Sequence, residues 1–390
     1  MKFSSLTDRV KGSAADAWDL HYEARQARAR GEDVIILSVG DPDFATPERV
    51  IERASQAMRD GDTHYTSILG HSELREAIAE RHRQSSGQQI DVNQVITTSG
   101  AQNALFACSL CLLEAGDEAI VLQPMYVTYE ATIQAPGATL VPVVLHAEQG
   151  FRLDRATLQN AISERTRAIF YASPSNPTGV ALNREELELI AEVARRHDLW
   201  VVADEVYADF LYAEQFHHIA ALPGMAERVI TIGSLSKSYA MSGWRVGWAI
   251  APPQMIANME KLALCMLYGL PGFIQQAGAE ALKHCAQDLQ SMREIYRQRR
   301  DFLFAAFSAI PGLEPLLPEA GMFMMVKVTG SGYTAADFSR ALYQASGVSV
   351  LDATAFGASA AGYVRVSYTV SEAELKEACA RIKSFMENLQ

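Results

Sequence analysis

The sequence lacks an apolar run long enough to cross a membrane. Its longest, ALFACSLCLL at residues 104–113, is too short for a membrane-spanning helix and is typical of a core helix. The opening MKFSSLTDRVKGSAADAWDL also lacks the apolar core of a signal peptide, because Asp8, Arg9 and Lys11 interrupt it. We therefore expect neither secretion nor membrane insertion, and a cytoplasmic location.

Basic residues are in deficit. The chain of 390 residues has 34 Lys and Arg against 46 Asp and Glu, a formal net charge of −12. Nucleic-acid binders need a basic surface that displaces counterions, so a nucleic-acid partner is disfavoured. No GxxxxGK[ST] motif occurs, and no GxGxxG motif follows a predicted strand. A nucleoside triphosphate or a dinucleotide is thus disfavoured as a ligand.

Cysteine is scarce. Five cysteines, an odd number in a long chain, fit a reducing cytosol better than a set of disulfide bonds. Cys108 and Cys111 form a CxxC motif inside the apolar run, which favours buried packing over a redox or zinc-binding role. His217 and His218 lack the i, i+4 spacing of helical metal ligands and are expected on a surface loop. We therefore expect no metal site.

The sequence does contain an alternation of β-branched runs and helical patterns between about residues 93 and 250. Strands are predicted at VITTSG, EAIVLQP, RAIFYASPSNPTG, LWVVADEVY and RVITIGSLSKS, with helices at AQNALFACSLCLLEAG and REELELIAEVARRHD. This alternation predicts an α/β fold with a mainly parallel sheet. Ligands of such sheets bind at the carboxyl ends of the strands, so the polar tips SGAQ, PMY, SPSNPTG, DEVY and SLSKS are expected to meet in one pocket.

The pattern changes toward both ends of the chain. A long charged helix at MREIYRQRRDFLFAAF, a strand pair at GMFMMVKV and YVRVSYTV, and a closing helix from Glu372 predict a smaller α+β domain. We expect it to comprise residues 1–45 and 291–390, with a large domain at residues 46–290. The uncharged segment CMLYGLPGF, residues 265–273, is predicted to face another subunit.

An anion site is predicted at the strand tips. Gly100 precedes a helix whose first turn, with Ala101 and Gln102, offers unpaired N–H groups to a phosphate. A glycine before a helix is by itself more often a plain turn. The segment GSLSKSYAMSGWR adds two hydroxyls and a guanidinium that can bind phosphate oxygens: Ser234, Ser236 and Arg245.

Lys237 stands in that segment with no carboxylate near it in the sequence. A partly desolvated lysine among cationic groups has a lowered pKa and becomes an amine nucleophile. Asp204 ends an apolar run, so its carboxylate needs an interior partner: an arginine, a helix cap or a cationic ring nitrogen. A lysine able to form a Schiff base and an aspartate facing a pyridinium nitrogen are the marks of a pyridoxal phosphate site. The combination predicts pyridoxal 5′-phosphate as the cofactor.

These motifs resemble those of the class I aminotransferases, pyridoxal phosphate enzymes of fold type I. The resemblance runs in order through SVGDPDFATP, HYTSILGHSELREAIA, SPSNPTG, ADEVY, SLSKSYAMSGWRVGW and YVRVSY. It implies a large domain with a mainly parallel seven-stranded sheet between helices, a small domain, and a homodimer with shared active sites. The implied activity moves the amino group of an amino acid to a 2-oxo acid in two half-reactions at one site.

The resemblance also implies residue roles. Lys237 would bind the cofactor and move a proton at the substrate α-carbon, and Asp204 would keep the ring nitrogen protonated. Tyr207 and Asn176 match the residues that hydrogen-bond the phenolic oxygen, and Tyr126 matches the ring that stacks on the pyridine. The phosphate-binding residues would be Gly100, Ala101, Gln102, Ser234, Ser236 and Arg245, with Tyr65 from the second subunit. Arg365, with Gly40 nearby, matches the clamp for the substrate carboxylate.

The donor is expected to be L-arginine and the acceptor pyruvate. DAWDLHYEAR, EKLALCMLYGLPGFIQ and EAGMFMMVKV resemble the bacterial arginine–pyruvate transaminases. Dicarboxylate-specific relatives often have a lysine where this sequence has Gln102, and a buried carboxylate without an ion partner is costly. Asp19 could pair with a guanidinium and Trp18 could stack on it, while a helix cap and a core residue are equally open interpretations.

Other interpretations stay open. An aminotransferase that prefers aspartate, an aromatic amino acid or alanine fits the same motifs. A carbon–sulfur β-lyase would use the same lysine to eliminate a thiol, and release of pyruvate and thiol from cystathionine without an acceptor acid would identify it. A regulator that senses pyridoxal phosphate would carry a basic helix-turn-helix segment, and none precedes Val39.

Overall fold

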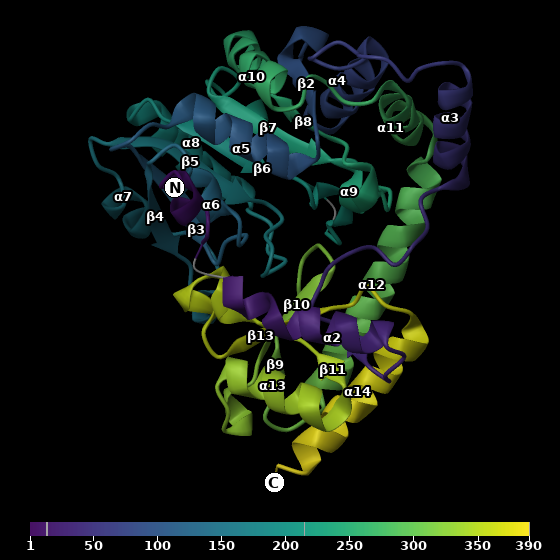
Figure 1. The fold of residues 1–390 in the computed structure, drawn as a ribbon. Helices are drawn as coiled ribbons and strands as arrows, with labels where there is room; N and C mark the ends of the chain where they lie inside the picture. Colours follow the sequence, from purple (N-terminus) through teal and green to yellow (C-terminus); the bar gives the residue numbers. More distant parts are fainter. Residues whose placement is uncertain (13–14, 214, 390) are drawn as a thin grey trace.

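Two lobes of different architecture make up the protein (Figure 1). The structure is a computed structural model and describes residues 1–12, 15–213 and 215–389. One lobe contains a seven-stranded sheet and the other a four-stranded sheet, and helix α12 (Ala286–Ser308) runs from one lobe to the other. No helix in the described part of the chain has the length and apolar character needed to traverse a bilayer.

The large sheet has the strand order β2-β8-β7-β6-β5-β3-β4. β8 is antiparallel to both of its neighbours, and every other neighbouring pair is parallel, which confirms the predicted α/β fold with a mainly parallel seven-stranded sheet. The bounds are β2 (Val95–Thr98), β3 (Glu118–Gln123), β4 (Thr139–Val144), β5 (Thr166–Ala172), β6 (Trp200–Asp204), β7 (Val229–Ser234) and β8 (Gly247–Ile250).

The sequence patterns predict five of these strands and miss β4 and β8. β4 lies at the edge of the sheet and contains Pro142, a residue that sheets tolerate only at such edges and that weakens a strand pattern. β8 is only four residues long and follows a short 3-10 turn at Ser242–Trp244, so no run of alternating residues marks it.

Helices cover both faces of the large sheet (Figure 1). One face packs against α5 (Ala101–Leu112), α6 (Tyr129–Gln134) and α10 (Pro253–Met266). The other face packs against α7 (Arg155–Asn160) and α8 (Arg184–Arg196) at one end of the sheet. At the other end it packs against α3 (Glu48–Arg59), α4 (Ser72–Ser86) and α11 (Gly272–His284). Because both faces are covered, the strands other than edge strand β4 are buried along nearly their whole length, as parallel sheets require.

The small lobe contains an antiparallel sheet in the order β12-β13-β10-β9. The predicted strand pair is confirmed as β10 (Phe323–Lys327) and β13 (Tyr363–Ser367), flanked by β9 (Glu314–Pro315) and β12 (Leu351–Asp352). Helices α2 (Asp19–Ala29), α13 (Ala335–Ser346) and α14 (Glu372–Glu387) belong to this lobe, and α14 begins where predicted. The short helix α1 (Leu6–Arg9) instead lies against the large lobe, where Arg9 donates to the backbone oxygens of Gln134 and Ala135.

Segments from both chain ends meet in the small lobe. β1 (Ile35–Ile36) pairs in parallel with β11 (Val348–Ser349), more than 300 residues later in the chain. The predicted domain boundaries at residues 45/46 and 290/291 stay a prediction, and α12 runs across the second of them.

The structure confirms the predicted environment of Cys108 but not that of His218. Cys108 is fully buried with its Sγ 3.9 Å from Met259 Sδ, and burial raises its pKa, which confirms a packing role. The expectation that His218 lies on a surface loop is wrong, since its side chain is only 8% exposed and its Nδ1 lies 2.8 Å from Glu205 Oε2. The physical reason is that the carboxylate of Glu205, 7% exposed at the end of β6, needs a polar partner.

Helix α12 anchors the small lobe through one apolar face. Its buried residues Met292, Tyr296, Leu303 and Phe307 recur at helical spacing and pack into one cluster with side chains of β10, α13 and α14. Leu303 is 0% exposed in this cluster, so a truncation there leaves a cavity that the surrounding side chains cannot fill.

We predict that Leu303→Ala lowers the free energy of unfolding by about 2 to 5 kcal/mol, the usual cost of a buried Leu→Ala change. Urea unfolding followed by circular dichroism measures this loss. Gln298→Ala, at an exposed position of the same helix, is the control and should change stability by roughly 0.5 kcal/mol or less. An equal effect of the two substitutions would contradict the packing described for α12.

Candidate active site

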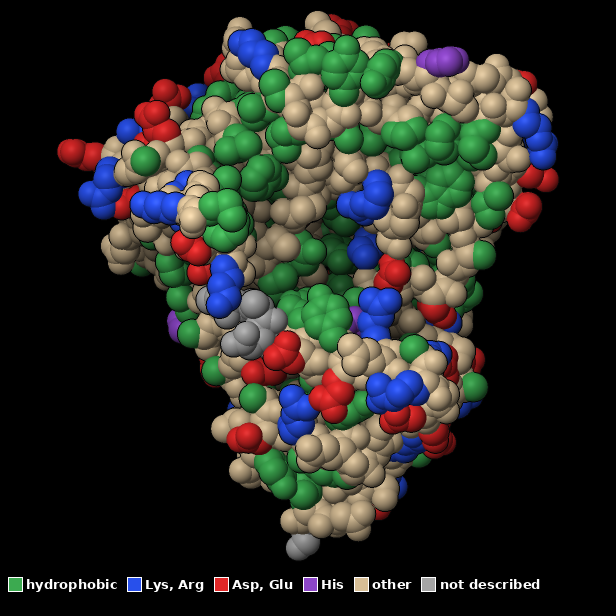
Figure 2. All heavy atoms as spheres, viewed as in Figure 1, with side chains coloured by type: hydrophobic (Ala, Val, Ile, Leu, Met, Phe, Trp, Pro, Cys, Tyr) green, Lys and Arg blue, Asp and Glu red, His purple; other side chains and the backbone are tan. Residues whose placement is uncertain are grey.

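The carboxyl ends of the large-sheet strands surround a cavity of about 160 Å³. All five predicted polar tips contribute to it, as expected where parallel strands end at one edge. The predicted site residues that line it are Ala101, Gln102, Tyr126, Asn176, Asp204, Tyr207, Ser234, Ser236, Lys237 and Arg245. The space-filling view shows the surface hollowed between the two lobes, with Lys and Arg side chains beside the hollow (Figure 2).

Lys237 lies in α9 (Leu235–Ser238), a single helical turn that follows β7. Its Nζ donates a hydrogen bond to the backbone oxygen of Gly40, 2.8 Å away, which comes from the N-terminal part of the chain. Burial, reinforced by Arg365 and Arg245 and opposed by Asp41, lowers the pKa of Lys237 to about 8. Near neutral pH the neutral amine is therefore far more populated than in an ordinary lysine.

Asp204 ends β6 and is 8% exposed. Its Oδ2 accepts a hydrogen bond from Tyr129 Oη at 2.9 Å, and its Oδ1 accepts one from the backbone N–H of Val206 at 3.2 Å. Burial raises the pKa of Asp204 to about 6, against the opposing effect of these two hydrogen bonds. Both partners are uncharged, so a cation inside the cavity would stabilise the ionised carboxylate.

Tyr129 was not among the predicted site residues. It is fully buried in the first turn of α6, and its ring centroid lies 6.0 Å from that of Tyr126 in an edge-to-face arrangement. The motif PMYVTY contains a usable signal, since two tyrosines three residues apart lie on the same side of a helical turn.

Groups that can bind an anion lie together at one end of the cavity. Gly100 is the N-cap of α5 and has a φ of +77°, and a Cβ there would lie 2.2 Å from Arg245 Nη2. Arg245 donates to the backbone oxygens of Ser242 at 2.8 Å and Ser99 at 3.2 Å, which holds its guanidinium beside the first turn of α5. Helix N–H groups, a guanidinium and the hydroxyl of Ser236 therefore gather at one place.

Arg365 extends from β13 of the small lobe and is 2% exposed. It donates to Asn176 Oδ1 and to the backbone oxygen of Ser38, both at 2.8 Å, and no described group pairs with its Nε. Burial lowers its pKa to about 10, and the ring of Phe323 lies 4.4 Å from its Cζ. No described carboxylate forms an ion pair with this guanidinium, so it suits an anionic ligand.

Six predicted residues do not line the cavity: Gly100 and Arg365, described above, and Tyr65, Trp18, Asp19 and Gly40. Tyr65 is 87% exposed, and its ring packs against that of Tyr268 at an interplanar angle of 56°, with centroids 4.8 Å apart. Trp18 is the half-buried N-cap of α2, and its ring centroid lies 6.0 Å from the Cζ of Arg365. Asp19 is exposed and is the first residue of α2, so it does not cap that helix. The backbone of Gly40 approaches the site through Lys237, and a Cβ there would overlap the ring of Phe323.

The side chain of Gln102 is held by two threonines. Its Nε2 donates to Thr132 Oγ1 at 3.0 Å, and its Oε1 accepts from Thr128 Oγ1 at 2.6 Å. Both hydrogen bonds join the start of α5 to α6. This wall of the cavity is therefore polar, uncharged and fixed in position.

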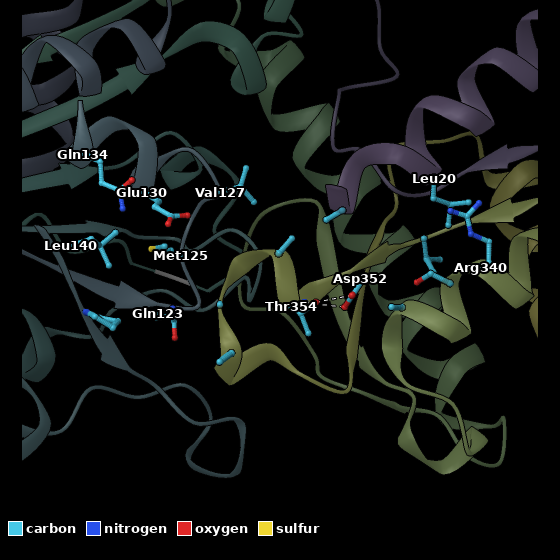
Figure 3. Close-up of a pocket in the computed structure, with 18 residues that line it drawn as sticks. Leu20, Gln123, Met125, Val127, Glu130, Gln134, Leu140, Arg340, Asp352 and Thr354 are labelled. Carbon is cyan, nitrogen blue, oxygen red and sulfur yellow. Dashed lines mark hydrogen bonds between the residues drawn. The ribbon is translucent and has the colours of Figure 1, made fainter. Parts of the chain in front are cut away.

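A larger groove of about 710 Å³ lies between the lobes (Figure 3). The large lobe contributes Met125, Val127 and Glu130 to its wall, and the small lobe contributes Leu20 and Arg340. Met125 and Val127 flank Tyr126, so the groove adjoins the cavity across this segment of the chain. Lys237 and Asp204 do not line the groove, which places the reactive groups in the smaller cavity.

Comparison with known proteins agrees with this site. The family described as aminotransferase class I and II matches residues 32–382. The arginine–pyruvate transaminase of Pseudomonas aeruginosa is 48% identical over 98% of this chain and 97% of its own, and an aspartate aminotransferase of Pyrococcus horikoshii is 35% identical over 94% of each.

The solved structure of the Thermus thermophilus aspartate aminotransferase with maleate has a TM-score of 0.94 and 33% identity, and the match covers 99% of this chain and 100% of that one. That likeness confirms the fold-type I architecture. The chain belongs to the class I and II aminotransferases, a family of amino-group-transferring enzymes.

Proposed function

We propose that this aminotransferase uses pyridoxal 5′-phosphate to move the α-amino group of L-arginine to pyruvate. The observation that carries the cofactor assignment is the pairing of Lys237 with Asp204 on one small cavity. One is a buried amine with a lowered pKa, and the other is a buried carboxylate whose hydrogen-bond donors are both uncharged. A pyridine aldehyde with a cationic ring nitrogen satisfies both groups at once.

The residues around the cavity fit the rest of that cofactor. The first turn of α5, the Ser236 hydroxyl and the Arg245 guanidinium would hold the phosphate, and the tight approach of Arg245 to Gly100 leaves no room for a side chain there. Tyr207 and Asn176 would bind the phenolic oxygen, and the Tyr126 ring would cover the pyridine. Burial raises the pKa of the Tyr207 phenol, so it stays a hydrogen-bond donor at working pH.

When bound, pyridoxal phosphate supplies an aldehyde that takes up the donor's amino group and a protonated ring that accepts electron density from the substrate α-carbon. Lys237 then acts as the base that removes the proton from the α-carbon, a role that suits an amine with a pKa of about 8. Asp204, with a pKa of about 6, is mostly ionised at neutral pH and holds a proton on the ring nitrogen.

Arg365 would bind the α-carboxylate of either substrate. Its side chain is buried without a carboxylate partner and is oriented by Asn176 and Ser38, so little reorganisation is needed when an anion arrives. A planar guanidinium binds a carboxylate through two parallel hydrogen bonds, which fixes the orientation of the α-carbon. Since both the amino acid and the 2-oxo acid have this carboxylate, one clamp serves both half-reactions.

Two observations support a cationic donor. The wall at Gln102 carries no charge, and both threonine bonds restrain it, so the distal carboxylate of aspartate would find no ion partner there. In addition, the relative with 48% identity is named as an arginine–pyruvate transaminase. Asp19, exposed next to Trp18 on the small lobe, is the residue that we propose to meet the guanidinium of the substrate.

A homodimer with shared active sites is part of the proposal. Four apolar side chains near the predicted subunit-facing segment are exposed in the single chain: Tyr65, Leu264, Met266 and Tyr268. A second copy of the chain would cover this surface and would bring its Tyr65 hydroxyl to the phosphate of the neighbouring site.

For the cofactor assignment, we predict that Lys237→Ala lowers transamination on the order of 10³-fold or more, because the base at the α-carbon is lost. Lys383→Ala, an exposed lysine on α14, is the control and should retain parental turnover. In the parent protein freed of cofactor, uptake of pyridoxal phosphate should quicken as the pH rises through about 8, because only the neutral amine adds to an aldehyde. Near-normal turnover of Lys237→Ala would contradict the assignment.

For the donor, we predict that the parent enzyme prefers L-arginine to L-aspartate, with pyruvate as acceptor. Asp19→Asn should lower kcat/KM for arginine by a factor that corresponds to about 1.5 to 3 kcal/mol of lost transition-state stabilisation, the value of a hydrogen bond to a charged group. It should leave kcat/KM for alanine and leucine unchanged. Steady-state kinetics of the parent and the variant with arginine, aspartate, alanine and leucine measure both differences. Equal losses for all donors would make Asp19 structural, and a preference for aspartate would exclude the arginine assignment.

For the shared site, we predict that Tyr65→Ala and Lys237→Ala, each nearly inactive alone, recover activity when mixed under conditions that exchange subunits. A hybrid dimer contains one site with both native residues, so recovery should approach about a quarter of the parental rate at equal mixing, since half of the dimers are hybrids with one intact site each. A fully active monomer at the assay concentration would refute the shared site.

A further inference from the structure

A second group of polar side chains lies next to the cavity but takes no part in the chemistry described so far. It consists of Arg81 on α4, Asp209, and the two residues that follow Lys237, Ser238 and Tyr239. Arg81 and Asp209 line a separate pocket of about 400 Å³, which shares only Val206 and Ser234 with the lining of the cofactor cavity. These residues therefore do not touch the cavity of Lys237, and we expect them to act on Lys237 through the residues that are bonded to it in the chain.

Asp209 is bound at both of its oxygens. Its Oδ2 accepts a hydrogen bond from Ser238 Oγ, and its Oδ1 forms an ion pair with Arg81 Nη2. Arg81 in turn donates from Nη1 to Tyr239 Oη at 2.9 Å, with its Cζ 5.9 Å from the centroid of that ring. One ion pair thus holds both residues that follow Lys237 in the chain.

The position of Asp209 in the chain gives this contact a second effect. Asp209 is the middle residue of the 3-10 turn at Ala208–Phe210, and Tyr207 is the N-cap of that turn. Helix α9 has only four residues, so its own hydrogen bonds hold it weakly. The Asp209–Ser238 bond therefore joins the turn that follows Tyr207 to the turn that contains Lys237.

We propose that Asp209, anchored by Arg81, is a positioning residue that fixes the Lys237 amine relative to the Tyr207 phenol through its bond to Ser238. The inference rests on the proposed cofactor role of Lys237. Asp209 itself touches neither substrate nor cofactor and acts only by positioning Lys237.

The contact acts through orientation and not through charge at the amine. Burial, with Arg365 and Arg245, lowers the pKa of Lys237 against the opposing effect of Asp41, and Asp209 is not among these influences. The other buried ionisable pair in the same pocket, His218 with Glu205, is bonded within itself and makes no hydrogen bond to α9 among the described residues. When the Asp209–Ser238 bond is broken, α9 gains freedom and the amine moves toward solvent, which raises its pKa toward the ordinary value.

The test uses the cofactor-loaded enzyme and three variants, Asp209→Asn, Ser238→Ala and Ser238→Thr. The first readout is the midpoint pH of the absorbance change of the lysine-bound cofactor, which would report the protonation of the Lys237 nitrogen in its bonded form, and hence how that nitrogen is held, independently of turnover. We expect Asp209→Asn and Ser238→Ala each to raise this midpoint by about half a unit or more and to lower kcat about 10-fold, with KM for the donor changed less than about 2-fold. The Asp209→Asn/Ser238→Ala double variant should add little to Asp209→Asn alone, because both substitutions weaken the Asp209–Ser238 contact and Asp209→Asn also removes the ion pair with Arg81.

Ser238→Thr keeps the hydroxyl and should restore the parental midpoint. The matched controls are Glu118→Gln at the start of β3 and Ser163→Ala just before β5, since Glu118 likewise accepts from a serine hydroxyl, that of Ser163, and from an arginine, Arg165. These controls should leave the midpoint and kcat unchanged. If Asp209→Asn does not fold, Ser238→Ala alone decides, with its melting temperature as the check on folding.

Parental midpoint and kcat in a folded Ser238→Ala variant would overturn the positioning role while leaving the cofactor role of Lys237 intact. A parent enzyme that shows no lysine-dependent cofactor absorbance would instead overturn the cofactor role, and the positioning role with it. The two failures are therefore distinguishable in one set of spectra.

Discussion

Three buried charged groups without buried counterions define the site and impose its main constraint. Asp204, Lys237 and Arg365 are each desolvated, and each has its pKa shifted toward the neutral form by burial. Burying a charge without a partner is costly, so such an arrangement persists only where the surrounding core holds it or where ligands supply the missing charges. Under the proposed function, a cationic ring nitrogen would supply the charge missing beside Asp204 and a carboxylate the charge missing beside Arg365, while the amine of Lys237 would bond to an aldehyde.

The second organising feature is that the site contains residues of both lobes. Lys237 and Asp204 belong to the large lobe, whereas Arg365 belongs to a strand of the small lobe and binds Asn176 of the large one. The backbone of the N-terminal segment completes the arrangement, since Ser38 accepts from Arg365 and Gly40 accepts from Lys237. The guanidinium of Arg365 therefore lies at the junction of the two lobes.

Much of the fold and of the cofactor cavity could be predicted from the sequence, because each strand tip is a local pattern of polar residues after an apolar run. What could not be predicted depends on contacts between distant segments. Tyr129 reaches Asp204 across 75 residues, and the buried pair of Glu205 with His218 depends on how a loop folds back over β6. Edge strand β4, with its proline, and the four-residue β8 carry too little periodicity to stand out.

The pairing of β1 with β11 has a consequence for the order in which the protein matures during synthesis. All strands of the large sheet lie between residues 95 and 250, so this sheet has every pairing partner once about two thirds of the chain has left the ribosome. β1, although made first, waits for residues 348–349, and Arg365 arrives later still. A nascent chain thus completes the cavity that contains Lys237 and Asp204 before Arg365 is made, and the N-terminal segment can pair only after the residues of that cavity have been made.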